Sequence, residues 1–383
     1  MPTNTIWIIS GEASGDDYGA GLARAIAKRR PDITIRGMGS DKMRAAGVDI
    51  MVDSTDLGIV GIVEVFRHIR FFLNLMKDLT ARAAAERPDA VVMIDYPGFN
   101  IRFAQRLHKI GIPVVYYISP QVWAWKAGRI PKIAACVSRM LCIFPFEPQC
   151  YAPTTLSAEF IGHPLFEQLN PMKGLGIQRE ENLVLLLPGS RRQEIQRLLP
   201  DFVNAACLLH RRNPALRFEF ATPRPAIQEY AQAMLAKMNL PEDAPEFSWR
   251  CGQTRERMLA ANAAVAASGT VTVEAAMLGL PVVVAYRLGA LSWWIGRRLV
   301  KLPSITIANL VCETTVFEEF LQDDCTPVHL ADAAERILPG GARRGECLRL
   351  LDEFTRRLGS AEAVSPKVAK IVLEECQKSA SQF

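Results

Sequence analysis

The sequence predicts an α/β protein built from two Rossmann-like, doubly wound parallel-sheet domains. Short apolar runs alternate with helical patterns, as in TIWIIS followed by GAGLARAIAKRR, and a second series of the same kind begins at NLVLLLPGS. This alternation is typical of βαβ units, whose parallel strands are joined by right-handed crossovers. The chain has 383 residues, more than one hydrophobic core usually holds. We therefore expect two domains.

The boundary between the domains is expected near residue 170, where HPLFEQLNPMKGLGIQREEN carries proline, glycine and charges without a clear period. The first domain then spans residues 1–170 and the second spans 171–344. Residues 345–383 are predicted to be C-terminal helices that pack back on the first domain. Two such domains facing a central cleft bring the carboxyl ends of both sheets together, where ligands usually bind. Side chains that directly follow a strand are therefore the functional candidates.

Composition limits the class of partner. A net charge of +5 with 22% charged residues favours acidic small molecules or an anionic surface and predicts no nucleic-acid partner. The nine cysteines form no CxxC pair, so we expect reduced thiols in a cytoplasmic protein. No metal-ligand pattern and no dinucleotide or P-loop motif occurs, so neither a metal nor a cofactor is expected. No apolar run reaches the ~18 residues of a membrane span, and any membrane association would be peripheral.

The first strand is followed by SGEASGDDYGAGL, which opens a helix. Small residues here let backbone amides approach a ligand, and a helix N-terminus favours an anion. Ser14, Gly15 and Asp16 are therefore candidates for substrate binding. A tight strand-to-helix turn with Asp16 or Ser14 as the helix cap explains the same motif equally well.

A single carboxylate, Asp95, follows the apolar run of VVMIDYPGFN. Pro97 and Gly98 then make the turn that exposes it at a strand tip, and Asn100 is a candidate substrate contact or support. The pattern supplies no second carboxylate nearby, which suits a reaction that needs one base.

Two further strand ends carry small polar residues. In LLLPGSRRQEI, Gly189 gives backbone freedom, Ser190 can cap the next helix and Arg191 stands at its positive end, which predicts a phosphate site. A plain helix cap would not explain the paired arginines. In ASGTVTVEAAMLGLPVVVAYR, the candidates are Ser268, Gly269, Thr270, Glu274 and Arg287. Glu274 either accepts hydrogen bonds from vicinal hydroxyls or closes a capping box that starts at Thr270 or the next residue.

A helical stripe of apolar residues edged by cations runs through GIVGIVEVFRHIRFFLNLMKD. Such a stripe can lie on an anionic bilayer or admit acyl chains, although it is more often core. From the pattern alone both interpretations stay open, and the candidates for membrane or acyl contact are Val60, Ile62, Val63, Phe66, Ile69, Phe72, Leu73 and Met76.

Together these motifs resemble one family. SGEASGD, GIVEV, IDYPGFN, YYISPQVWAWKAGRI, FPFEPQ, FIGHPL, LLPGSRRQEI and ASGTVTVEAAM occur in this order and resemble the lipid-A-disaccharide synthase family. The resemblance implies an inverting hexosyltransferase of the glycosyltransferase B fold, bound peripherally to the inner face of the cytoplasmic membrane. It implies transfer of 2,3-diacylglucosamine from UDP-2,3-diacylglucosamine to 2,3-diacylglucosamine 1-phosphate (lipid X), which gives a β-1,6-linked disaccharide 1-phosphate and UDP. A homodimer through the C-terminal helices is compatible with the resemblance but has no sequence signature.

The resemblance also implies individual roles. Asp95 corresponds to the family's proposed catalytic aspartate, Arg191 to its UDP-binding arginine and Glu274 to the acidic residue after the Ser-Gly-Thr loop. Asn309 in SITIANLV corresponds to an asparagine near the donor, and residues 60–76 correspond to the membrane-facing patch. With Asp95 as the base, Arg191 and the amides of the two polar loops would stabilise the leaving diphosphate in place of a divalent ion.

The chain departs from the family pattern at two places. Gly98 is found where many members carry a second aspartate, and VCETTV follows Asn309 where an Ala-Gly-Arg run is common.

The alternatives to this function are a UDP-sugar epimerase or another glycosyltransferase of the same fold, and a non-catalytic lipid or nucleotide-sugar binding protein. The presence of both Asp95 and Arg191 disfavours a non-catalytic protein.

Overall fold

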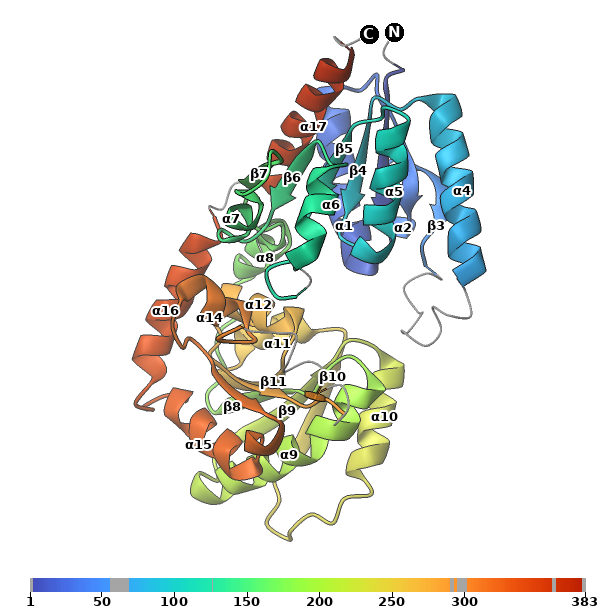
Figure 1. The fold of residues 1–383 in the computed structure, drawn as a ribbon. Helices are drawn as coiled ribbons and strands as arrows, with labels where there is room; N and C mark the ends of the chain where they lie inside the picture. The colour runs from blue at the N-terminus through green and yellow to red at the C-terminus, as the bar shows by residue number, and fades with distance from the viewer. Residues whose placement is uncertain are drawn as a thin grey trace. The chain divides into compact units, whose positions relative to one another are not determined.

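The computed structural model describes residues 3–55, 69–125, 127–289, 293–294, 302–359 and 363–380 (Figure 1). The chain divides into two compact units. Unit 1 contains Met1–Phe166 and Ser360–Phe383, and unit 2 contains Glu167–Gly359. Each unit holds one parallel sheet with its own helices. The predicted α/β class with two Rossmann-like parallel-sheet domains is therefore confirmed.

Unit 1 is built on a seven-stranded parallel sheet of order β3-β2-β1-β4-β5-β6-β7. Strands β1, β4 and β5 lie at its centre and are buried almost throughout, as expected for strands covered on both faces. The strands are β1 (Thr5–Ser10), β2 (Thr34–Gly39), β3 (Asp49–Asp53), β4 (Ala90–Ile94), β5 (Val114–Tyr117), β6 (Arg139–Cys142) and β7 (Ser157–Phe160).

The long helices of unit 1 bury one apolar face each. Helix α1 does so through Leu22, Ala23 and Ile26, at the spacing of a single helix face. The described helices are α1 (Ala13–Arg29), α2 (Asp41–Ala45), α4 (Ile69–Glu86), α5 (Pro97–Lys109), η1 (Ala127–Arg129), α6 (Ile130–Ala134), α7 (Glu147–Tyr151), α17 (Val364–Ala380) and α8 (Leu165–Lys173), which runs into unit 2.

Unit 2 is built on a six-stranded parallel sheet of order β10-β9-β8-β11-β12-β13. Every residue of β8 and β11 is buried, which explains the unbroken apolar runs LVLLL and AAVAA. The strands are β8 (Leu183–Leu187), β9 (Arg217–Thr222), β10 (Phe247–Cys251), β11 (Ala263–Ala267), β12 (Val282–Tyr286) and β13 (Glu318–Leu321). The described helices are α9 (Arg192–Arg212), α10 (Pro225–Leu235), α11 (Thr254–Ala260), α12 (Thr270–Met277), α14 (Ile307–Cys312), η2 (Gln322–Asp324), α15 (Pro327–Ile337) and α16 (Arg344–Arg357).

The C-terminal helices divide between the two units, unlike the expectation that all of residues 345–383 pack on the first domain. Helix α16 belongs to unit 2, where it packs on α12 and α14. Its Arg357 donates a hydrogen bond to the carbonyl of Val311 at 2.8 Å. Helix α17 packs on α1 and β4 of unit 1. The break at residue 360 therefore lies between these two helices and not before both of them.

Candidate functional site

In unit 1 the chain makes a strained turn where β4 ends. Asp95 and Tyr96 are consecutive non-glycine residues in the left-handed region, with φ of 44° and 48°. Left-handed backbone costs energy for residues with a Cβ and is often found at functional sites. The carbonyl oxygen of Asp95 accepts two hydrogen bonds, from Asn100 Nδ2 and from the hydroxyl of Tyr116, both at 2.7 Å. These two buried donors hold the turn that presents the Asp95 carboxyl.

The surroundings of the Asp95 carboxyl raise its pKa. Burial raises the pKa of Asp95 to about 6, and the negative charge of Glu12 adds to the increase. A backbone hydrogen bond from Tyr96 acts in the opposite direction. A carboxyl with such a pKa is ionised at neutral pH and can accept a proton from a bound hydroxyl.

Glu12 is the second carboxylate that sequence reasoning missed. Strands β1 and β4 are paired with Ser10 opposite Ile94, so Glu12 and Asp95 follow neighbouring strand ends. Gly11, which precedes Glu12, packs closely against the ring of Tyr96, which follows Asp95. A Cβ at position 11 would lie 2.5 Å from Cδ1 of Tyr96. The usual 3-2-1-4 strand order of doubly wound sheets would have predicted this neighbour.

The other polar residues after β1 mostly serve the fold. The Asp16 side chain is buried and its carboxylate accepts hydrogen bonds from the amides of Ser40 at 2.6 Å and Lys42 at 3.0 Å, at the start of α2. A Cβ on Gly15 would lie 2.4 Å from Oγ of Ser10, so this glycine permits close packing of α1 on β1. Glu12, not Ser14 or Asp16, occupies the N-cap position of α1, and it makes no side-chain cap there. The alternative cap assignment is therefore wrong, and Ser14 is left exposed at the helix start.

In unit 2 the loop after β8 is held by Glu194, a residue in the first turn of the following helix α9. Glu194 Oε2 accepts hydrogen bonds from the amides of Ser190 at 2.9 Å and Arg191 at 3.2 Å. Gly189 has φ of +119°, and a Cβ there would lie 2.4 Å from Glu194 Oε2. Two of the amides expected to hold phosphate are thus occupied by a carboxylate. The Arg191 side chain is 80% exposed, with Nη1 3.3 Å from Glu194 Oε1, and is the available cation of this loop.

The loop after β11 is less constrained. Gly269 and Thr270 are exposed and Ser268 is half-buried at the start of α12. Glu274 is the fifth residue of this helix, so the capping-box interpretation is wrong. Its Oε1 instead accepts hydrogen bonds from Nε and Nη2 of Arg255, at 3.0 and 2.5 Å. Arg255 is a partner that the sequence pattern did not indicate.

Arg287 and Asn309 are both engaged inside unit 2. Arg287 pairs with Asp201 at 3.2 Å and donates to the carbonyl of Cys325 at 2.6 Å. The Asn309 side chain is 8% exposed; Nδ2 donates to the carbonyl of Phe317 and Oδ1 accepts from its amide, at 2.9 and 2.8 Å. Asn309 holds the residue before β13 and Arg287 holds the segment after this strand, so direct ligand contact would require both residues to leave these partners.

The apolar stripe of α4 is split between core and surface. Phe72 packs against the core of unit 1 and Met76 is buried in it, whereas Phe71 and Leu73 are about half exposed. The expected contact residues Val60, Ile62, Val63 and Phe66, and the side chain of Ile69, lie outside the described part of the chain. None of the described helices combines the length and the apolar character needed to cross a bilayer.

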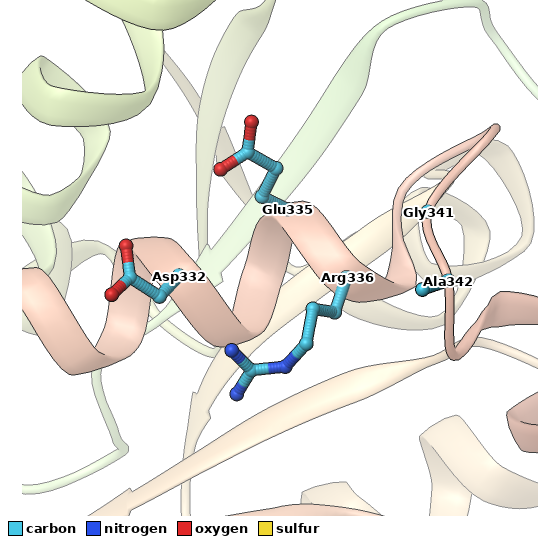
Figure 2. Close-up of a pocket in the computed structure, with 5 residues that line it drawn as sticks. All are labelled: Asp332, Glu335, Arg336, Gly341 and Ala342. Carbon is cyan, nitrogen blue, oxygen red and sulfur yellow. The ribbon is translucent and has the colours of Figure 1, made fainter.

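A shallow cavity of about 330 Å³ opens on unit 2 (Figure 2). Asp332, Glu335 and Arg336 of α15 line it, together with Gly341 and Ala342 of the following loop. Asp332 and Glu335 both pair with Arg212, at 2.7 and 2.9 Å. These residues lie near the ends of α9 and α15, helices that run back from the edge where β8 and β11 end. The cavity therefore offers no group to the strand-end loops.

Comparison with known proteins identifies relatives along nearly the whole chain. The family model described as lipid-A-disaccharide synthetase matches residues 6–373. A lipid-A-disaccharide synthase of Koribacter versatilis is 39% identical over 97% of this chain and 99% of its own length. The enzyme of the same name from Myxococcus xanthus is 37% identical over 96% of this chain and 97% of its own length.

Solved structures resemble the fold at low sequence identity. A Staphylococcus aureus protein in a structure titled MnaA–UDP co-structure is 14% identical, with a TM-score of 0.64 and coverage of 97% of this chain and 96% of that one. The glycotransferase of kitacinnamycin is also 14% identical, with a TM-score of 0.63 and coverage of 97% and 98%. Both support the predicted glycosyltransferase B architecture of two parallel-sheet units. With the family model and the curated relatives matched over almost their full lengths, the chain belongs to the lipid-A-disaccharide synthase family.

Proposed function

We propose that this protein transfers 2,3-diacylglucosamine from UDP-2,3-diacylglucosamine to 2,3-diacylglucosamine 1-phosphate, in lipid A biosynthesis. The names of the relatives support this reaction. The single observation that carries the mechanism is the Asp95 carboxyl, held in a strained turn with its pKa raised to about 6. The reaction is tested by measuring UDP release from the diacylated donor in the presence of the acceptor.

Asp95 acts as the general base. Its carboxylate removes the proton from the 6-hydroxyl of the acceptor while the hydroxyl oxygen attacks C1 of the donor from the face opposite to the diphosphate. The C1–O bond to UDP breaks with its electron pair, so the configuration at C1 inverts and UDP leaves as an anion. A single carboxylate is enough, because the diphosphate needs no protonation to leave. Glu12 supports this role by making Asp95 a stronger base than an isolated aspartate.

The leaving diphosphate requires positive groups. Arg191 is an exposed cation at the N-cap of α9, and the amides of Gly269 and Thr270 lie at the exposed start of α12. Glu194 occupies the amides of Ser190 and Arg191, so a phosphate would reach them only by displacing this carboxylate. The structure thus favours Arg191 as the main contact, with loop amides added after Glu194 moves.

Substituting Arg191 with alanine should weaken UDP binding by about 10- to 100-fold, the loss typical of a charge-assisted contact with phosphate. The neighbouring Arg192 gives a matched control, because its guanidinium lies over the ring of Tyr230, 5.2 Å from the centroid. Arg192→Ala should leave UDP affinity nearly unchanged. Isothermal titration of UDP against both variants measures this difference. Equal affinity of the Arg191→Ala variant and the wild type would refute the phosphate role.

Peripheral binding to the inner face of the cytoplasmic membrane would bring the enzyme to its acylated substrates. The described residues that support it are Phe71 and Leu73, exposed on α4, with Arg70 and Lys77 on the same helix. An apolar surface edged by cations suits an anionic bilayer. Phe72 and Met76 are better assigned to the core than to this contact.

The double substitution Phe71→Ser and Leu73→Ser should lower binding to vesicles of anionic phospholipid by at least about tenfold, because each side chain can contribute on the order of 1 kcal/mol or more on burial. Val328→Ser removes an exposed apolar side chain of α15 in unit 2 and serves as the control. Co-sedimentation with vesicles compares the three proteins. Undiminished sedimentation of the double variant would place the membrane contact elsewhere.

A further inference from the structure

The segment that follows β5 is tied to helix α7 by two side-chain hydrogen bonds. Nε1 of Trp123 donates to Oε1 of Glu147 at 3.2 Å. The hydroxyl oxygens of Ser119 and Tyr151 lie 2.9 Å apart. Glu147 and Tyr151 are the first and last residues of α7, so both ends of this one-turn helix hold the same segment.

The Glu147 side chain is buried, and a buried carboxylate loses the free energy of its hydration. Its side chain is 1% exposed, and its second oxygen accepts hydrogen bonds from the amides of Ile143 and Phe144, both at 3.0 Å. The indole of Trp123 packs edge-on against Phe146, with ring centroids 5.1 Å apart. The carboxylate thus joins the segment after β5 to the end of β6. A buried carboxyl often adds nothing to stability compared with an apolar side chain. Because three donors nevertheless surround the Glu147 carboxylate, we infer that its role is to fix the geometry of the segments that carry them.

This connection continues to the catalytic turn. The amide of Asp95 donates to the carbonyl of Tyr117 at 3.1 Å, and the next residue, Ile118, donates from its amide to the carbonyl of Leu141 at 3.0 Å. Ile118 has φ of 72°, a left-handed conformation that is strained for a β-branched residue. The segment held by Glu147 therefore follows a strained residue that lies directly after β5, the strand that pairs with β4. Movement of this segment would be transmitted to the Asp95 turn through the backbone of β5.

The pKa of Glu147 is consistent with a link between Glu147 and the Asp95 turn. Burial raises the pKa of Glu147 to about 7, with a further contribution from the charge of Asp95, while the donors at Phe144, Trp123 and Ile143 lower it. Glu147 has no part in the proton transfer described above. Its two oxygens are already occupied by donors from within unit 1.

We propose that Glu147 is a positioning residue for glycosyl transfer, which holds Trp123 and the 119–125 segment beside the Asp95 turn so that the acceptor meets the base in a reactive geometry. This role rests on the proposed transfer reaction. The motifs FPFEPQ and SPQVWAW then act together, because the first supplies the carboxylate and the second supplies the indole that it orients. Small displacements of this kind cost catalysis more than they cost binding.

A double-mutant cycle tests the pair. Glu147→Gln keeps the shape but cannot accept from both backbone amides and the indole, and Trp123→Phe keeps an aromatic ring against Phe146 while removing the donor. Each single variant should lower kcat by about 10- to 100-fold with little change in KM for the donor. The double variant should be no slower than the slower single variant, because both changes break one link. Trp249 of unit 2, which stacks on Phe220 with ring centroids 4.4 Å apart, provides the control, since Trp249→Phe should combine additively with Glu147→Gln.

Tryptophan fluorescence gives a readout that does not depend on activity. The difference in emission between wild type and Trp123→Phe isolates Trp123, and this difference should change when measured in the Glu147→Gln background. Additive losses in the double variant, or wild-type kcat in either single variant, would overturn the positioning role while leaving the transfer reaction intact. Absence of transfer by the wild type would refute the proposed function instead. An unchanged Trp123 emission would then still reject the link to Glu147.

Discussion

Asp95→Asn is expected to lower kcat by about 10²- to 10⁴-fold, the range over which a positioned general base usually acts. The amide cannot take the acceptor proton, whereas the turn that carries it keeps the hydrogen bonds to its carbonyl from Asn100 and Tyr116. UDP affinity should change little, since the proposed diphosphate contacts are in unit 2. Steady-state UDP release and titration of UDP separate these two effects. Near-normal turnover would remove Asp95 from the mechanism.

The stability of the same variant distinguishes loss of a base from loss of the fold. The pKa of Asp95 rises from 3.8 to about 6 on folding, so its contribution to stability is fully present below pH 3.8 and is lost as the pH rises through 6. At pH 8 the buried charge then opposes folding, by up to about 3 kcal/mol. Asp95→Asn should therefore have a Tm at pH 8 that is no lower than that of the wild type. A fall of many degrees would mean that the variant loses activity by unfolding.

The activity of the wild type is expected to fall about tenfold between pH 8 and pH 5, with an acidic limb near pH 6. Asp95 is protonated below this pH and can no longer accept the hydroxyl proton. Glu12→Gln should move the limb to lower pH, because the Glu12 charge helps to raise the pKa of Asp95. Profiles of kcat/KM against pH for the two proteins measure the shift.

A matched control removes a carboxylate elsewhere in unit 1. Asp32 is exposed and pairs with Arg30 at 2.6 Å, and Asp32→Asn should leave the acidic limb in place. The acidic limb can also contain a contribution from Glu147, because burial raises the pKa of Glu147 to about 7 and the charge of Asp95 adds to this increase. The Glu147→Gln profile identifies that contribution. An acidic limb that is identical in wild type and Glu12→Gln would show that Glu12 does not tune the base.

Much of the fold could be predicted because it depends on local patterns. The alternation of TIWIIS, VVMID and VVYY with helical segments is sufficient to indicate βαβ units, and the strands have these bounds to within a residue or two. The turn at Asp95 was equally accessible, since a carboxylate followed by Tyr-Pro-Gly breaks an apolar run. Assignment of α16 to unit 2 was not accessible, because both C-terminal helices have one apolar face and the sequence does not say which sheet it covers.

The details of the site depend on partners distant in the sequence. Glu12 lies 83 positions before Asp95 and becomes its neighbour only through the pairing of β1 with β4. Arg255 and Glu274, and Asn309 and Phe317, likewise meet through tertiary packing. In α4 the 3.6-residue period fits more than one face, and packing on the sheet decides that Phe72 turns to the core while Phe71 and Leu73 stay exposed. A sequence motif therefore located these loops without showing which side chains remain available to a ligand.

The most direct test of the proposed function is a product analysis with the purified full chain, UDP-2,3-diacylglucosamine and 2,3-diacylglucosamine 1-phosphate. We predict that UDP and a β-1,6-linked disaccharide 1-phosphate form in equal amounts, and that little UDP forms when the acylated acceptor is left out. Replacing the donor by UDP-N-acetylglucosamine should give neither transfer nor a C2 epimer. Conversion of UDP-N-acetylglucosamine to its epimer, or no transfer between the two diacylated sugars, would contradict the proposed function.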